Sequence, residues 1–159
     1  MKIAEERYSM DLAAEILPLG RRSFRESTEA KGETCAFHGE RDFDIEPDME
    51  QYQRLQDSGV LVILTLRDEA ALVGYLVAAV YRSLHHKKMV CANVDTLYVE
   101  PDHRTYSPVL IEAFEKSMRE KQVDIIGWPT HINGPIYEVL KTRGYVGDDT
   151  IMEKRLCVS

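Results

Sequence analysis

The sequence predicts a mixed α/β domain in which a mainly antiparallel central sheet is flanked by helices. Three observations lead to this prediction: a short strand-like segment and two helical segments precede residue 58, three apolar strand-like runs follow one another from 60 to 99, and helical and strand-like segments then alternate to 156. The chain has 159 residues without repeats, low-complexity tracts or linkers. That length suits one core. We therefore expect a single domain over residues 1–159, with a variable part up to about residue 58 and a core from 60 to 156.

The N-terminal part predicts one short strand and two helices. Residues 1–8, MKIAEERY, show a short alternation typical of a strand. Helical spacing of apolar residues begins at Asp11. Residues 23–41 are polar, contain two glycines and show no period, which predicts a loop with room for a second short helix. Residues 44–57 predict another helix, with Pro47 near its start and a glycine just past its end.

The central part predicts three consecutive strands. The apolar runs are VLVILTL at 60–66, ALVGYLVAAVY at 71–81 and VCANVDTLYV at 90–99. A polar turn at 67–69 and a polar connection at 84–88 separate them. Because these connections are short, the three strands should pair as an antiparallel meander.

After Pro101 the apolar period becomes helical. Three large apolar residues recur four apart and should pack into the core: Leu110, Phe114 and Met118. Residues 123–128 predict a further strand that includes a core tryptophan, 134–141 a short helix ended by Gly144, and 150–156 a last strand.

Composition excludes several classes of function. A net charge of −7 argues against nucleic acid as a main partner, and no apolar run approaches the ~20 residues of a membrane span. The N-terminus has no apolar stretch typical of a secretory signal. Three widely spaced cysteines, Cys35, Cys91 and Cys157, make neither a disulfide framework nor a thiolate zinc site, so we expect a cytoplasmic protein without a metal.

The negative charge is concentrated between residues 25 and 50, where nine acidic side chains face three basic ones. One interpretation is a solvated surface. The other is an electrostatic field that attracts a cationic substrate such as an amine.

Residues 94–115, VDTLYVEPDHRTYSPVLIEAFE, resemble the core of the GNAT acyltransferases. In that family a strand ending in Leu-x-Val-x-Pro leads through Arg-x-x-Gly-x-Gly/Ala into a helix, and here the strand ends in LYVEP and the arginine is Arg104. A second match starts at Asn133, whose segment NGPIYEVLKTRGY is similar to the Asn-x-x-Ala…Gly-Phe/Tyr helix of the family. The resemblance covers residues 60–156 in element order. The segments LYVEPDHR, HHKK and MEKRL look most like acetyltransferase-like proteins of tailed phages.

The resemblance implies acetyl-CoA, or another short acyl-CoA, as cofactor, with its binding centre between residues 93 and about 114. Backbone left free where the central strands splay apart would pair with the pantetheine arm, and a loop feeding a helix N-terminus would bind the pyrophosphate. The implied cofactor-binding residues are Leu97, Tyr98, Val99, Arg104, Thr105, Tyr106, Ser107, Val109 and Asn133.

The loop departs from the family pattern. Ser107 and Val109 stand at its glycine positions, and Pro108 between them has no N–H to donate. Ser107 followed by Pro108 suits a helix start, as N-cap and first-turn proline, so the helix should begin where it does in the family. Residues 104–106 would compensate in part for the lost phosphate donors. The alternative is a strand-to-helix turn that has lost its ligand.

Acylation of an amine needs a base for the incoming ammonium and an acid for the leaving thiolate. The family's tyrosine acid falls at Leu140 here, so Tyr137, about one helical turn earlier, is the substitute candidate. Asn93 stands where the family often has a glutamate, which leaves Asp95 and His131 as candidate bases. Structural roles, in which Tyr137 packs and His131 only ends a strand, are the alternatives.

These residues predict an acetyl-CoA-dependent N-acyltransferase that transfers an acetyl group to a primary amine, on a small molecule or a protein, by direct attack on the thioester. The family also makes a homodimer an expectation. The competing hypothesis is an inactive GNAT-shaped binding or inhibitory module, possibly phage-encoded, that acts on a host protein. His38 and Cys35 could suggest nucleophilic catalysis, but the sequence shows no oriented third group for it. Residues 85–88, HHKK, are interpreted as a solvated turn.

Overall fold

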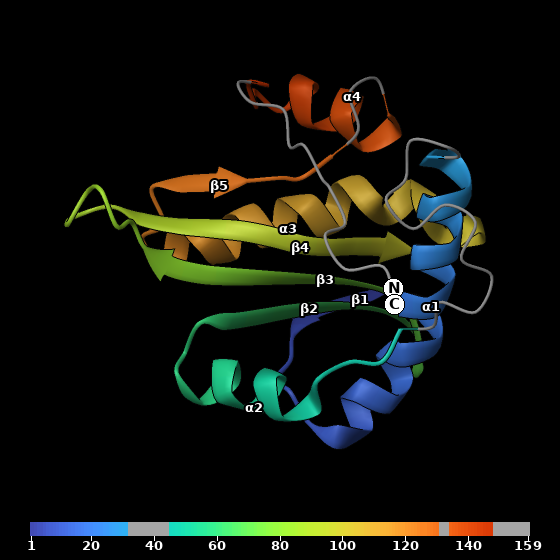
Figure 1. Ribbon diagram of the computed structural model, residues 1–159. Helices are drawn as coiled ribbons and strands as arrows, with labels where there is room; N and C mark the ends of the chain where they lie inside the picture. Colours follow the sequence, from blue (N-terminus) through green and yellow to red (C-terminus); the bar gives the residue numbers. More distant parts are fainter. Residues whose placement is uncertain (32–44, 131–133, 148–159) are drawn as a thin grey trace.

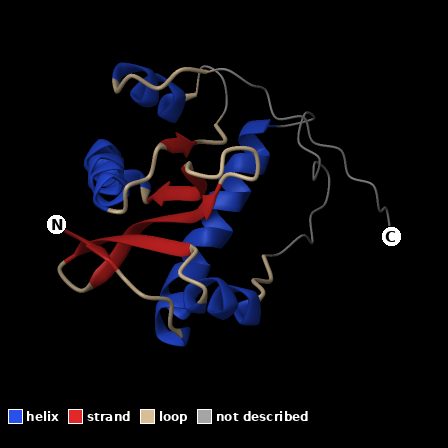
Figure 2. Ribbon diagram, turned by 90° about the vertical axis from the view of Figure 1, so that its left-hand side faces the viewer, coloured by secondary structure: helices blue, strands red, loops and turns tan. Residues whose placement is uncertain are grey.

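The computed structural model describes residues 1–31, 45–130 and 134–147. It contains one five-stranded sheet with helices on both faces (Figures 1 and 2). Its elements in chain order are β1 (Lys2–Glu5), α1 (Met10–Lys31), α2 (Met49–Asp57), β2 (Leu61–Asp68), β3 (Ala71–Arg82), β4 (Val90–Val99), the 3-10 helix η2 (Pro101–Tyr106), α3 (Ser107–Glu120), β5 (Ile125–Gly127) and α4 (Pro135–Thr142).

The strands lie in the order in which they occur in the chain, β1-β2-β3-β4-β5. The first four pair antiparallel and β4 pairs parallel with β5. The antiparallel meander of β2, β3 and β4 confirms the prediction from the three apolar runs. Strand β5 runs parallel to β4 because α3 returns the chain from the last residue of β4 to the opposite end of the sheet, where β5 begins.

Two apolar clusters hold the layers together. On one face α3 packs its predicted stripe, Leu110, Phe114 and Met118, against β2, β3 and β4, and all three side chains are buried. On the other face α1 and α2 pack against alternate residues of the same strands. Trp128 lies at the edge of the first cluster, with its ring 5.9 Å from that of Phe114 in an edge-on contact. Both were predicted as core residues.

The N-terminal helices differ from the predicted ones in their bounds. The prediction of a loop from residue 23 is wrong for 23–31, because α1 continues to Lys31. This stretch, SFRESTEAK, has no apolar period, and in the helix its Phe24, Glu26 and Ser27 are half-buried. Helix α2 begins only at Met49: Asp48 caps it by accepting a hydrogen bond of 2.8 Å from the N–H of Gln51.

Three further boundaries are corrected. Arg67 and Asp68 belong to β2, so the turn is only Glu69–Ala70; Arg67 is held in place by Glu6 and Glu15. Strand β5 has three residues rather than six, because it pairs only with Cys91–Asn93. The predicted last strand, 150–156, lies outside the described residues.

The predicted N-cap of α3 is wrong by one position. Ser107 has helical angles (φ −55°, ψ −43°) and is the first helical residue, so Tyr106 occupies the N-cap and makes no side-chain capping bond. The reason is that η2 runs directly into α3, which leaves no extended residue for a serine cap. Pro108 still lies in the first turn, where its missing N–H costs nothing.

Candidate functional site

A β-bulge interrupts β4 at Asp95. Val77 of β3 pairs with Thr96 and the next residue, Ala78, pairs with Val94, so Asp95 is the extra residue. The bulge shifts the alternation: Val94 before it and Leu97 after it both face α3. Asp95 itself is exposed and accepts a hydrogen bond of 3.1 Å from the hydroxyl of Thr96.

Strands β4 and β5 part next to this bulge. Their described pairing ends at Asn93 opposite Gly127. Beyond that point the β5-facing edge of β4, residues 94–99, has no partner strand in the described part of the chain. Gly127 lies so close to Asn93 that a Cβ atom there would be 2.3 Å from the Asn93 side-chain oxygen. The splay expected from the sequence is thus present in the sheet.

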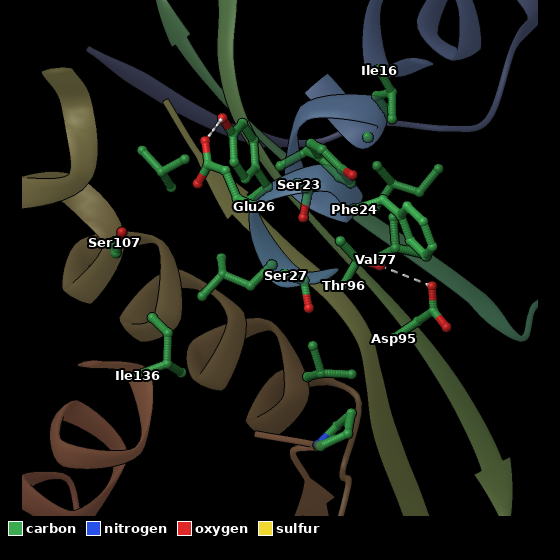
Figure 3. A pocket seen from close by; sticks show the side chains of 18 of the residues that line it. Ile16, Ser23, Phe24, Glu26, Ser27, Val77, Asp95, Thr96, Ser107 and Ile136 are labelled. Atoms are coloured by element: carbon green, nitrogen blue, oxygen red, sulfur yellow. Dashed lines mark hydrogen bonds between the residues drawn. The ribbon is translucent and has the colours of Figure 1, made fainter. Parts of the chain in front are cut away.

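A cavity of about 1340 Å³ opens along the parted strands. Helix α1, β3, β4, η2, the start of α3 and the start of α4 contribute to its walls. Figure 3 shows Ser107 and Ile136 at one end, and Asp95 and Phe24 at the other. The volume exceeds the range of about 300–1,000 Å³ that is usual for small-molecule sites.

Most of the expected cofactor-binding residues line this cavity: Leu97, Tyr98, Val99, Arg104, Thr105 and Ser107. Tyr106 and Val109 do not; their side chains are 39% and 48% exposed. Asn133 lies outside the described residues. The helical turns of η2 and α3 explain the difference, because they spread successive side chains around the helix axis, some toward the cavity and others into solvent.

Glu26 is a cavity residue that the sequence analysis missed. Its carboxylate accepts a hydrogen bond of 2.9 Å from the Tyr98 hydroxyl and pairs with the Arg104 guanidinium. Arg104 also reaches the carbonyl oxygen of Val99, at 3.4 Å. Burial, and then the hydrogen bond to Glu26, raise the pKa of Tyr98. A sequence separation of more than 70 residues left no local signal for this cluster.

Asp95 and two tyrosines, Tyr52 and Tyr75, also line the cavity. Burial is the main reason why the pKa values of Tyr52 and Tyr75 are raised, and the negative charge of Asp95 raises both further. Both phenols therefore stay protonated at neutral pH. The sequence left the direction of Asp95 open; the bulge places it among the residues that line the cavity.

The candidate acid, Tyr137, lies elsewhere. Tyr137 is not among the cavity-lining residues: its hydroxyl lies beside Gly147, 3.2 Å from where a Cβ atom would stand there, and Lys141 lies 5.5 Å from its ring centre. Ile136 and Val139 of the same helix line the cavity instead. Leu140, at the family's tyrosine position, is buried. His131 lies outside the described residues.

The structure bears on three further points from the sequence: the connection at 85–88, metal binding and membrane spanning. Residues 83–89 form a solvent-exposed connection between β3 and β4, and Leu84 at its start is 96% exposed. In the described ranges, no three His, Cys, Asp or Glu side chains gather in a way that suits a metal ion. None of the described helices is long and apolar enough to cross a bilayer.

No protein-family model and no curated protein matches the chain. Solved structures do. A tetramutant of the BH1408 protein from Bacillus halodurans has a TM-score of 0.75 at 16% identity, over 98% of this chain and 100% of that one. Ribosomal-protein-alanine N-acetyltransferase from Brucella melitensis biovar Abortus 2308 has a TM-score of 0.67 at 18% identity, over 98% and 100%.

An aminoglycoside acetyltransferase from an uncultured soil metagenomic sample, in complex with sisomicin, has a TM-score of 0.69 at 17% identity, over 99% of this chain and 97% of that one. These similarities establish the fold: the chain has the mixed, mainly antiparallel GNAT acetyltransferase architecture. At such low identity they establish the fold alone. The similarity to phage proteins remains a sequence resemblance.

Proposed function

We propose that this protein is an acetyl-CoA-dependent N-acyltransferase that acts on a primary amine. The observation that carries the proposal is the bulge at Asp95 beside the point where β4 and β5 part, at the wall of a cavity large enough for cofactor and acceptor. Acetyltransferases among the structures of the same fold support it.

The residues present fit an acyl-CoA arm. The β5-facing edge of β4 offers backbone groups at Leu97, Tyr98 and Val99 to the amides of the arm, as an added strand would. Arg104, Thr105 and the start of α3 at Ser107 face the same cavity and would hold the pyrophosphate.

Tyr106, Val109 and Asn133 have weaker claims to this binding site. The side chains of Tyr106 and Val109 point to solvent, so we retain these two residues only for their backbone N–H groups. Asn133 remains a proposal from the sequence resemblance.

The bound thioester would supply an activated acyl group. Asp95 is the proposed base: it lines the cavity at the bulge, where its carboxylate would take the proton of an incoming ammonium. His131 and Tyr137 remain candidates from the sequence resemblance. Since Tyr137 lies beside Gly147 rather than in the cavity wall, we propose that it supports the fold and that another group, or water, protonates the thiolate.

Thiol release from acetyl-CoA over a panel of primary amines tests the proposal. Wild type should release thiol only when amine is present, and Asp95→Asn should lower kcat by about 10²-fold with little change in acetyl-CoA affinity. Thr96→Val is the matched control, since it removes the hydroxyl that binds Asp95 but keeps the carboxylate. No thiol release with any amine would refute the transferase.

Three observations favour a second candidate, a GNAT-shaped binding or inhibitory module. Arg104 is occupied by Glu26, Pro108 offers no N–H, and Leu140 replaces the tyrosine acid. Isothermal titration separates the two candidates: absence of acetyl-CoA binding at millimolar concentration would select the module, for which a host protein is the proposed target if the phage resemblance holds. A cytoplasmic location and a homodimer also belong to the proposal; size-exclusion chromatography with light scattering tests the latter.

A further inference from the structure

The end of the cavity with Asp95 and Phe24, opposite Ser107, has an aromatic lining; we call it the acceptor end. Five side chains form what we call the aromatic chamber of this cavity: Tyr8, Phe24, Met49, Tyr52 and Tyr75. The rings of Tyr8 and Tyr52 stack at 5.6 Å, and the Tyr8 hydroxyl lies 3.1 Å from the Met49 sulfur. Aliphatic side chains of α1 and β2 complete the wall, Ile16, Leu17 and Ile63. This end therefore suits an apolar body.

Charge is sparse among the described residues of the cavity wall. Of its described lining residues, only Glu26, Asp95 and Arg104 are charged, and Glu26 and Arg104 neutralise each other. Asp95 forms no ion pair with any residue of the described ranges, and its polar contact there is the hydroxyl of Thr96. Among the described lining residues, Asp95 is thus the carboxylate without a paired cation, and Figure 3 shows it at the same end of the cavity as Phe24.

These neighbours complement a single cation. Asp95, Tyr52 and Tyr75 all line this cavity, and Figure 3 shows Asp95 at the same end as Phe24 of the aromatic chamber. The negative charge of Asp95 also raises the pKa of both tyrosines, after burial. An ammonium beside Asp95 would gain a charge–charge contact and attraction to the electron-rich ring faces. A polycationic acceptor would need several carboxylates, and the described lining offers one that is free.

We propose that the acceptor is a primary amine with one positive charge on an apolar or aromatic body, with its ammonium at Asp95 and its body in the aromatic chamber. This inference rests on the proposed function, because it assigns the acceptor to the same cavity. It distinguishes the acceptor from polyamines and aminoglycosides.

Direct binding to the full chain without cofactor tests the inference. The probes are 2-phenylethylamine, its neutral analogue 2-phenylethanol and the tricationic spermidine, titrated at pH 7 and followed by calorimetry or ligand-observed NMR. The amine should bind about fivefold more tightly than the alcohol, the gain usual for an exposed charge pair and a cation–π contact. It should also bind more tightly than spermidine.

Variants locate the contact. Asp95→Asn should reduce the amine's affinity to that of the alcohol and leave the alcohol unchanged. Tyr52→Leu should weaken both probes, and Tyr52→Phe, which keeps the ring, should restore binding. Unfolding midpoints of the variants show whether each one is folded. Equal binding of amine and alcohol, tighter binding of spermidine, or no amine binding at about 10 mM would overturn the inference.

A transfer assay separates this inference from the proposed function. If 2-phenylethylamine binds at Asp95 but wild type releases no thiol from acetyl-CoA, the acceptor site stands and the transferase fails. If thiol is released with spermidine but not with 2-phenylethylamine, the transferase stands and the inference fails.

Discussion

Glu26 holds Arg104 at the cofactor end of the cavity, and replacing it with glutamine should strengthen binding of CoA. In the free protein the Arg104 guanidinium is paired with the Glu26 carboxylate, so an incoming pyrophosphate must compete with that carboxylate for it. Glutamine keeps the size of the side chain and removes its charge. Arg104 is then free for the phosphates, and one negative charge near them is gone.

The exposure of the pair limits the size of the effect. The side chains of Arg104 and Glu26 are 54% and 42% exposed, so their ion pair is worth at most about 1 kcal/mol. Releasing it should therefore tighten CoA binding by up to about fivefold. The gain should shrink as salt rises, because exposed charges are screened.

Isothermal titration of CoA at low and high salt measures this effect. Glu29→Gln is the matched control: it removes the same charge from an exposed position of the same helix. In the Arg104→Ala background, Glu26→Gln should lose most of its effect, since the two residues act through one contact. If Glu26→Gln binds CoA no better than Glu29→Gln, Arg104 does not bind the phosphates and the reasoning fails.

Three predictions concern stability. Arg143→Met should lower the free energy of unfolding by about 2–3 kcal/mol. It removes the guanidinium paired with the buried Glu115 carboxylate, which keeps the exposed Arg119, 3.3 Å away, and a hydrogen bond with Tyr145. Urea unfolding of Arg119→Met, expected to cost under about 1 kcal/mol, is the control. Arg143 lowers the pKa of Glu115 below its ordinary 4.5, so this carboxylate stabilises the fold above pH 4.5 and loses that effect as pH falls through its folded pKa. Unfolding between pH 6 and 3 should therefore depend less on pH in Glu115→Gln than in wild type, and equal slopes would contradict the assignment. Gly144→Ala should cost about 1 kcal/mol, since φ of +88° after α4 strains any side chain; an unchanged melting temperature would show that the turn relaxes.

Local sequence determined most of the elements. Strand β4 was predicted with its observed bounds, because its sequence, VCANVDTLYV, is a strand-like run with a polar connection before it and a proline shortly after it. The helix behind Ser107 followed from apolar residues four apart. The resemblance around LYVEP and Arg104 also indicated the fold. All of these signals lie within a few residues of one another, where backbone preference and side-chain period act directly.

Only the tertiary structure decided how the site is built. Asp95 faces the cavity because β4 bulges against β3, and alternation alone left its direction open. Glu26 meets Tyr98 and Arg104 from 72 and 78 residues away, in a stretch that the sequence predicted as loop. Such contacts depend on how α1 packs across the sheet. The chain's own pattern therefore determined the strands and helices, whereas the packing of distant elements decided which carboxylates line the cavity and which of them is free.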